Sequence, residues 1–147
     1  MMLDLTNTDR YYDVDEVRYK YGIRHVKYQL AGHGQHPSRR QMDDIIGVIK
    51  QFKQNHPNQY IGIHCTHGFN RTGFIICSYL VECCNRYVGD AIADFAASRQ
   101  NGIYRENVIE ELYQRYDPTY LAVPMLLTIP SPPWHKEHRP QNNQMES

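Results

Sequence analysis

The stretch that most constrains the fold is Tyr60–Gly73, which reads YIGIHCTHGFNRTG. Ile61 and Ile63 alternate with small or polar residues, as they do in a half-buried strand. A glycine-bearing loop follows, and an apolar run of helical length begins at Thr72. The stretch therefore predicts a strand, a loop and a helix in direct succession.

The loop between this strand and helix has the pattern HCxxGxxRTG. A loop that enters a helix points several unpaired N–H groups at one place, and the helix dipole adds positive potential, so phosphate is favoured there. The same field stabilises a thiolate, lowering a cysteine pKa from about 8.5 into the range ~3.5 to 7.5. We therefore expect Cys65 to be a nucleophile, Arg71 to grip two phosphoryl oxygens, and Thr72 to hydrogen-bond the sulfur.

The rest of the loop is expected to bind phosphate through its backbone. The residues concerned are Thr66, His67, Gly68, Phe69 and Asn70. Among them, His67 and Phe69 are expected at the rim of the pocket, and Asn70 is expected to shape the loop through bonds from side chain to backbone. Taken alone, Cys65 reads as a small buried residue and Arg71 as a surface charge. Their joint spacing after a strand favours the phosphate-binding loop.

The pattern HCxxGxxRTG resembles the signature of cysteine-dependent phosphatases. The fuller string HCTHGFNRTG looks like the metazoan-type RNA 5′-triphosphatase domain of mRNA-capping enzymes. Three further segments resemble the same domain: LDLTNTDRYYD at 3–13, GHGQHP at 32–37 and GIYRENVIEELYQRY at 102–116. The resemblance spans about residues 3–117 and implies an RNA 5′-triphosphatase that needs no cofactor.

The resemblance also carries expectations about the setting of the domain. It implies a nuclear location, 5′-triphosphate RNA as substrate, and a guanylyltransferase module or RNA polymerase II as partners. A guanylyltransferase would be marked by a KxDG motif, which does not occur in the 147 residues. Family members carry a segment before the strand at Met2–Leu5, so the resemblance predicts an N-terminally truncated domain with apolar surface exposed where that segment would pack.

Composition restricts the class of protein. A chain of 147 residues is expected to form one domain, and its 16 basic and 16 acidic residues leave no overall field to recruit RNA. Neither a signal peptide nor an apolar run of membrane-spanning length is present, so no membrane partner is expected. The cysteines have no secreted-type spacing, which indicates an intracellular, reducing setting.

A zinc site is the alternative use of four cysteines and eight histidines. No CxxC pair or HxxxH spacing occurs, so we predict no metal site. We expect Cys77, Cys83 and Cys84 to lie in the core instead.

Hydrophobic periodicity predicts an α/β fold with a largely parallel central sheet flanked by helices, of the cysteine-phosphatase type. Strands are expected at 2–5, 25–30 and 60–64. Helices are expected at 13–22 with Asp13 as N-cap, from a Ser38 capping box to about 55, at 74–84 buried on nearly all sides, from an Asp90 N-cap, and at 108–116. Six of the eight prolines lie between Pro118 and Pro140, so 118–147 is expected to be a polar tail or linker.

Leaving-group chemistry bears on the substrate. Relatives that hydrolyse phosphotyrosine or phosphoserine use an aspartic acid, on a loop before the helix that leads to the nucleophile strand, to protonate the leaving group. The corresponding stretch here, AGHGQHP at 31–37, has no carboxylate, and Asp43 and Asp44 fall inside a predicted helix. Because the last pKa of a phosphate is about 6, a diphosphate leaves without a proton. The missing acid therefore favours an anhydride over a phosphoester.

Other roles stay open at this point. Asp4 or His33 could supply the proton, although Asp4 is equally well explained as a strand-end carboxylate that binds nearby amides. His64 is expected to order the loop and tune the thiolate rather than act as a base. The leading function is RNA 5′-triphosphatase. The alternatives are an RNA phosphatase that removes both γ- and β-phosphates, a dual-specificity protein phosphatase, and a truncated inactive form that only binds RNA or capping partners.

Overall fold

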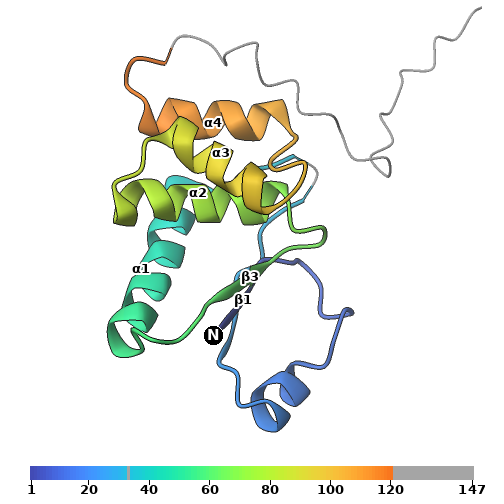
Figure 1. The fold of residues 1–147 in the computed structure, drawn as a ribbon. Helices are drawn as coiled ribbons and strands as arrows, with labels where there is room; N and C mark the ends of the chain where they lie inside the picture. Colours follow the sequence, from blue (N-terminus) through green and yellow to red (C-terminus); the bar gives the residue numbers. More distant parts are fainter. Residues whose placement is uncertain (33, 121–147) are drawn as a thin grey trace, which may run out of the picture.

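The computed structural model describes residues 1–32 and 34–120, and its centre is a parallel sheet (Figure 1). The strands are β1 (Met2–Asp4), β2 (His25–Lys27) and β3 (Gly62–His64), in the order β2-β1-β3. Leu3 in the central strand pairs with Val26 on one side and Ile63 on the other. All three carboxyl ends therefore meet at one edge of the sheet, and the loop that contains Cys65 begins there.

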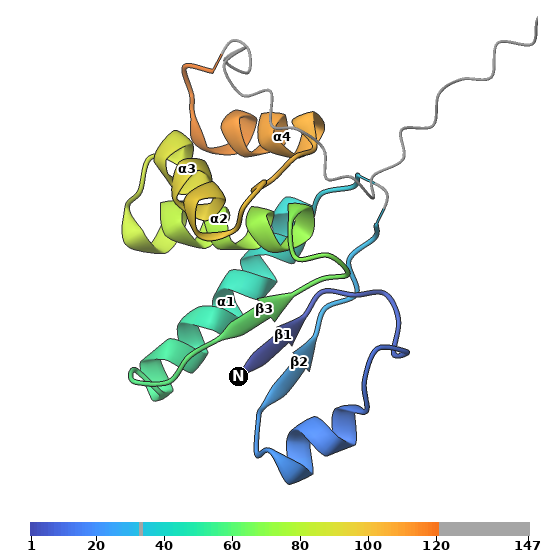
Figure 2. The same cartoon turned by 45° about the vertical axis from the view of Figure 1, so that its right-hand side comes forward.

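In the described part of the chain, five helical segments accompany the sheet. They are η1 (Glu16–Lys20), which is a short π-helix, α1 (Arg39–Asn55), α2 (Asn70–Cys84), α3 (Val88–Ser98) and α4 (Glu106–Tyr116). Helix α1 runs beside β3, while α2, α3 and α4 stack into a helical layer next to it (Figures 1 and 2). This arrangement confirms the α/β fold with a parallel sheet. No helix in the described residues is long and apolar enough to cross a membrane.

One helix cap lies at the predicted residue and another does not. The Ser38 capping box is confirmed, because Ser38 Oγ accepts from Gln41 N–H at 3.2 Å and Gln41 Oε1 accepts from Ser38 N–H at 2.9 Å. The prediction that Asp90 is an N-cap is wrong, since α3 begins at Val88 with Tyr87 as its N-cap. Asp90 lies in the first turn, where a carboxylate also interacts favourably with the helix dipole.

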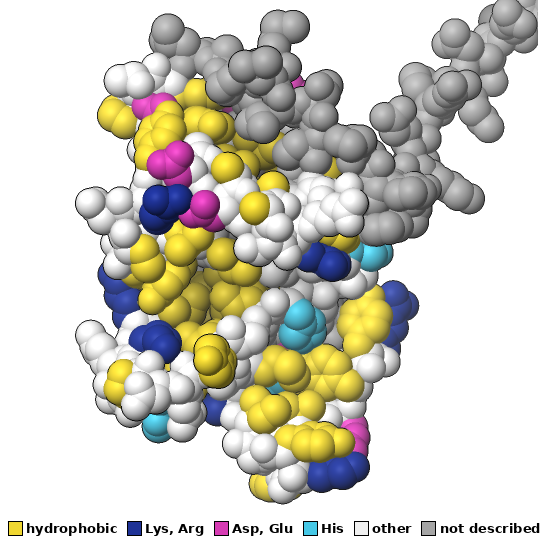
Figure 3. Space-filling model, in the orientation of Figure 1, with side chains coloured by type: hydrophobic (Ala, Val, Ile, Leu, Met, Phe, Trp, Pro, Cys, Tyr) yellow, Lys and Arg dark blue, Asp and Glu magenta, His cyan; other side chains and the backbone are white. Residues whose placement is uncertain are grey.

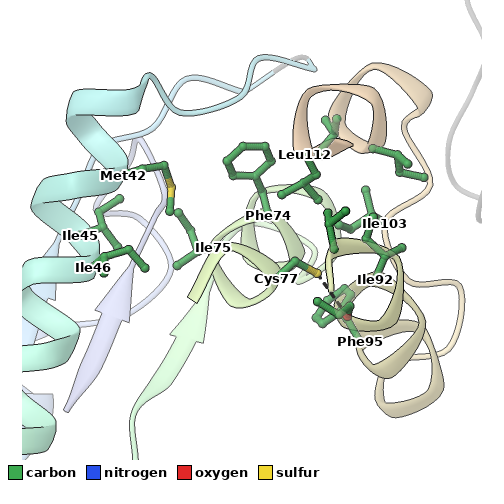
Figure 4. Packing of buried hydrophobic residues seen from close by; sticks show 14 of the residues in the cluster. Met42, Ile45, Ile46, Phe74, Ile75, Cys77, Ile92, Phe95, Ile103 and Leu112 are labelled. Atoms are coloured by element: carbon green, nitrogen blue, oxygen red, sulfur yellow. Dashed lines mark hydrogen bonds between the residues drawn. The ribbon is translucent and has the colours of Figure 1, made fainter. Parts of the chain in front are cut away.

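Apolar side chains from the sheet and the helices meet in one core (Figure 4). Its members include Leu3 of β1, Ile45 of α1, Phe74 of α2, Ile92 of α3 and Leu112 of α4. These side chains hold the sheet against the helical layer, and so fix where α2 begins relative to the carboxyl ends of the strands.

Helix α2 is buried less completely than its composition predicts. Its buried residues all lie between Thr72 and Ser78, and the last turn reaches the surface. Cys77 is fully buried, Cys83 is half-buried and Cys84 is exposed, so the expectation of a core position is wrong for Cys84. The apolar run therefore predicted the helix correctly but did not predict that its C-terminal end is exposed.

An apolar groove borders the side of β3 that faces away from β1. Ile61, Ile63, Ile76 and Tyr79 line it, together with Ile49 of α1. The yellow hollow beneath the helical layer in Figure 3 shows hydrophobic side chains gathered on this face. The expected tail at 118–147 lies almost entirely outside the described residues, since only 118–120 are described.

Candidate active site

Cys65 follows β3 directly and lies at the bottom of a loop that leads into α2. Its Sγ accepts a hydrogen bond from the backbone N–H of Gly68 at 3.3 Å and another from Thr72 Oγ1 at 3.1 Å. Gly68 has a φ of +74°, a left-handed conformation that glycine adopts without strain and that turns its amide toward the sulfur. The sequence stretch therefore folds into the strand, loop and helix that it predicts.

These donors change the acidity of the thiol. Burial by itself would raise the pKa of Cys65, but hydrogen bonds from the Thr72 hydroxyl and from the backbone N–H groups of Thr72, Gly68 and His67 outweigh it. The net result is a pKa below that of an ordinary cysteine. A larger fraction of Cys65 is then thiolate near neutral pH, which is the form that attacks phosphorus.

The guanidinium of Arg71 is fixed by both the sheet and the loop. Its Nη1 donates to the carbonyl oxygens of Leu5 at 3.2 Å and Leu30 at 3.0 Å, and Nη2 donates to Thr66 Oγ1 at 2.9 Å. Arginine has five N–H donors, so among the described residues Nε–H and one Nη2–H are left without a partner. These two groups form one edge of the planar fork, which suits bidentate binding of a phosphoryl group.

Arg99, at the end of α3, supports the loop from outside, and nothing in the sequence pointed to it. Its Nη2 donates to the carbonyl oxygen of His67 at 3.1 Å and its Nε to that of Gly68 at 3.4 Å. Its guanidinium also lies over the Phe69 ring, 4.3 Å from the ring centroid. Because two loop carbonyls are held toward Arg99, the amides of the loop are free to point inward.

Two loop residues lie differently from the prediction. The expectation that Phe69 lines the rim is wrong, because its side chain is only 3% exposed and packs edge-on against Tyr104. Asn70 does bind backbone groups through its side chain, but they belong to the segment between α3 and α4. Its Oδ1 accepts from Tyr104 N–H at 3.2 Å and from Arg105 N–H at 3.1 Å. Asn70 therefore ties the start of α2 to that segment.

Asp4 lies at the end of β1 with 2% of its surface exposed. It accepts hydrogen bonds from the N–H and Oγ1 of Thr6 at 2.8 and 2.6 Å, from the Tyr12 hydroxyl at 2.8 Å and from Lys27 Nζ at 3.2 Å. Burial would raise its pKa, but these bonds hold it far below the usual range of a carboxyl group. Asp4 is therefore ionised and has no proton to donate near neutral pH.

A phenol links this carboxylate to two histidines. The Tyr12 hydroxyl lies 2.8 Å from Asp4 Oδ2, 2.9 Å from His25 Nε2 and 2.8 Å from His64 Nε2. Its one proton goes to the carboxylate, so both histidines donate to its oxygen from Nε2. Burial first, and then the bond to Asp4, raise the pKa of Tyr12, while burial lowers the pKa of His25. The cluster joins all three strands, because Asp4 is in β1, His25 is in β2 and His64, which precedes Cys65, is in β3.

His64 connects this cluster to Cys65. It immediately precedes Cys65, and its Nδ1 lies 3.4 Å from the Cys65 carbonyl oxygen. The ring is therefore held between the Tyr12 hydroxyl and the backbone at the start of the loop. This geometry suits the expected part of His64, which is to order the loop and tune the thiolate.

The carboxylates that follow the segment 31–37 lie in a helix. Asp43 and Asp44 are inside α1, as predicted. His36 stacks on Phe74 and lies 3.6 Å from Glu111 Oε2, while His33 is outside the described residues. No group of three or more His, Cys, Asp and Glu side chains in the described part of the chain could hold a metal ion.

The loop geometry agrees with a comparison against protein families. The model of the dual specificity phosphatase catalytic domain matches residues 1–117. The chain belongs to this family. The matched domain thus occupies about four-fifths of the sequence, and the family implies cysteine-dependent phosphatase activity.

Curated relatives of this phosphatase domain include mRNA-capping enzymes. The Caenorhabditis elegans enzyme is 42% identical over 137 residues, which cover 93% of this chain and 22% of the relative. The mouse enzyme is 43% identical over 79% of this chain and 19% of its own length. The expected resemblance to capping enzymes is confirmed, and the chain spans about a fifth of the length of these relatives.

Other relatives of the domain carry different descriptions. An RNA/RNP complex-1-interacting phosphatase from mouse is 37% identical over 79% of this chain and 36% of its own length. Among solved structures, Tk-PTP in the active form matches with a TM-score of 0.65 at 20% identity and covers 78% of each chain. A putative protein tyrosine phosphatase from Leishmania major matches with a TM-score of 0.60 at 23% identity, over 78% of this chain and 71% of that one. At these identities the structures show the shared fold.

Proposed function

We propose that this phosphatase domain is an RNA 5′-triphosphatase that removes the γ-phosphate and leaves a 5′-diphosphate end, as in the first step of mRNA capping. The observation that carries the proposal is the state of Asp4. The candidate carboxyl group beside the loop is ionised by its hydrogen bonds, and the segment 31–37 contains no carboxylate. A substrate whose leaving group needs no proton fits such a site, and a diphosphate is one.

The chemistry follows from the loop. The Cys65 thiolate attacks the γ-phosphorus in line, the bond from that phosphorus to the bridging oxygen breaks, and the diphosphate end leaves with the electron pair. Loop amides and the free edge of Arg71 hold the equatorial oxygens, so catalysis consists of positioning and charge stabilisation. Water then attacks the cysteinyl phosphate and releases inorganic phosphate, while Thr72 stabilises the departing thiolate. The proposed reaction uses no metal.

The proposal extends to partners and place. The similarity to capping enzymes supports nascent 5′-triphosphate RNA as substrate, a guanylyltransferase module or RNA polymerase II as partner, and the nucleus as location. The RNA/RNP complex-1-interacting phosphatase among the relatives also supports an RNA substrate. The second candidate is an RNA phosphatase that removes both the γ- and the β-phosphate.

One experiment separates these functions. The protein and its Cys65→Ser variant are incubated, with EDTA present, with RNA labelled at the γ- or β-phosphate and with a phosphotyrosine peptide. Release of the γ-label alone supports the proposal. Release of both labels supports the second candidate, and turnover of the peptide without turnover of RNA supports a protein phosphatase. A folded protein that binds RNA without turning over any substrate would be the inactive binding form.

A further inference from the structure

We propose that the exposed segment 18–24 is a binding surface for single-stranded RNA, separate from the loop that contains Cys65. The segment reads RYKYGIR and leads from η1 to β2. All seven residues are exposed, and they include three basic and two aromatic side chains but no acidic one. Because the 16 basic and 16 acidic residues of the whole chain balance, contact with RNA phosphates needs a local surface of this kind.

A tight turn of the backbone gives this surface its shape. Ile23 N–H donates to the Val17 carbonyl oxygen at 3.2 Å, and Gly22 has a φ of +63°, so the chain doubles back at the end of η1. Arg18 and Arg24 each directly follow one partner of this hydrogen bond. The turn therefore brings the two arginines to the same part of the surface, although six positions separate them in the sequence.

Three side chains of the segment have no partner among the described residues. No hydrogen bond, ion pair or ring contact joins Arg18, Tyr19 or Arg24 to another side chain in that part of the protein. Tyr19 is 83% exposed, so its ring is open to solvent. Two guanidinium groups and one phenol ring are therefore available to a ligand.

Lys20 and Tyr21, by contrast, are already engaged. Lys20 Nζ pairs with Glu16 Oε1 at 2.5 Å and lies 5.2 Å from the centroid of the Tyr21 ring. Because Glu16 offsets the charge of Lys20, the unpaired positive charge of the surface comes from Arg18 and Arg24.

The available groups suit RNA rather than an acidic peptide. Proteins that bind single-stranded RNA follow its phosphates with basic side chains and stack its bases on aromatic rings or guanidinium planes. Arg18 and Arg24 supply the cations, and Tyr19 supplies the ring. An acidic or phosphorylated peptide would pair with the arginines but would leave the ring unused. Because every base has a flat face, such a surface accepts RNA of any sequence.

The surface lies away from the Cys65 loop. The Met2 N–H donates to the Arg24 carbonyl oxygen at 2.8 Å, so segment 18–24 adjoins the amino ends of the strands. The Cys65 loop begins at their carboxyl ends. In Figures 1 and 2, η1 is the blue helix at the bottom, at the opposite end of the strands from the start of α2. RNA held by the segment is therefore the body of the strand and not its 5′ end.

The test measures the binding of a labelled RNA of about 20 nucleotides that ends in a 5′-hydroxyl and so carries no terminal phosphate. At about 0.1 M salt, Arg18→Gln and Arg24→Gln should each raise its Kd about fivefold and lower the slope of log Kd against log salt by about 0.7, the contribution of one phosphate contact. Tyr19→Ala should raise the Kd about tenfold through the loss of one stacked base, and Tyr19→Phe should leave it near the wild-type value.

Two exposed residues outside the segment serve as controls. Lys50→Gln removes a positive charge from α1, and Tyr60→Ala removes a ring from a residue that is 93% exposed, so neither should change the Kd. The surface is overturned if the wild-type protein does not bind this RNA, or if the segment variants bind it no more weakly than the controls do. Equally tight binding of a phosphoserine peptide, together with no effect of Tyr19→Ala, also overturns it.

Turnover separates this surface from the proposed function. With triphosphate RNA of about 20 nucleotides, Arg18→Gln should raise KM about fivefold and keep kcat, whereas with a nucleoside triphosphate it should change neither. An equal loss on both substrates contradicts the surface, because it would mean that the variant disturbs the Cys65 loop. A protein that binds the 5′-hydroxyl RNA through segment 18–24 but releases no phosphate from triphosphate RNA keeps the surface and overturns the proposed function alone.

Discussion

The hydroxyl of Tyr12 lies 2.8 Å from Nε2 of His64, the residue directly before Cys65. The same hydroxyl binds the buried carboxylate of Asp4 at 2.8 Å. Through this one oxygen, the segment after β1 holds the ring that precedes Cys65. The arrangement explains how a loop between β3 and α2 is fixed by residues far away in the sequence.

Removing the hydroxyl should therefore affect both stability and activity. We expect Tyr12→Phe to lower the free energy of unfolding by about 1 to 3 kcal/mol, because Asp4 loses a donor and the buried His25 and half-buried His64 lose an acceptor. The variant should also turn over more slowly, since His64 is no longer held. Urea unfolding and steady-state kinetics measure the two effects. Tyr19→Phe, at an exposed position, should change stability by no more than about 0.5 kcal/mol, and an equally small effect of Tyr12→Phe would contradict this account.

The acidity of Cys65 is set in part by Thr72. The hydrogen bond from Thr72 Oγ1 to Cys65 Sγ lowers the thiol pKa, so Thr72→Ala should raise it and shift the pH profile of iodoacetamide alkylation to higher pH. Thr72→Ser keeps the hydroxyl and should restore the profile. If Thr72→Ala alkylates with the wild-type pH dependence, the bond has no influence on the thiolate.

Asp4 should make stability depend on pH at the acid end. Its folded-state pKa is depressed relative to the unfolded value of about 3.9, so its contribution is present above pH ~4 and is lost as the pH falls toward the folded-state pKa. Asp4→Asn should cost about 3 kcal/mol at pH 7, since a buried hydrogen-bonded carboxylate is replaced by an amide that brings its own donors. Its unfolding free energy should then fall less between pH 4 and 2 than that of the wild type. Parallel pH profiles for the two proteins would count against the account.

Gly73 allows α2 to approach its neighbours closely. A Cβ at this position would lie 2.5 Å from Ile103 Cγ1 and 2.6 Å from Phe95 Cε1, so Gly73→Ala should destabilise the fold by about 1 to 3 kcal/mol. Gly47 in α1 is the matched control, because a Cβ there meets nothing within 4 Å. Gly47→Ala should stabilise the fold by up to about 1 kcal/mol through helix propensity. Thermal unfolding measures both changes in stability. If Gly73→Ala leaves the stability unchanged, the close packing around Gly73 does not contribute as described.

The strand, the loop and the helix around Cys65 could be predicted because their signals are local. Alternating Ile61 and Ile63, the glycine and the apolar run lie within one short stretch. The Ser38 capping box was equally readable, since its two bonds join residues three apart. The N-cap prediction for Asp90 is wrong because a carboxylate is favourable both at an N-cap and in the first turn of a helix.

Long-range contacts could not be read in the same way. Arg99 reaches the loop carbonyls from the end of α3, and Tyr12 meets His64 across the sheet. A single arginine or tyrosine carries no sequence pattern that would indicate a partner so far away in the chain. Phe69 was misplaced for a related reason, since its burial depends on Tyr104 and Arg99, which the fold brings to it from later in the chain.

The central claim is that Cys65 attacks the γ-phosphorus of a triphosphate RNA. The most direct measurement is rapid quenching of the enzyme with RNA labelled at either the γ- or the β-phosphate, followed by detection of label bound to the protein. We expect transient labelling at Cys65 from the γ-phosphate alone, more label in Thr72→Ala because the thiolate leaves more slowly, and none in Cys65→Ser. Release of the γ-phosphate without labelling of Cys65, or at an unchanged rate in Cys65→Ser, would contradict it.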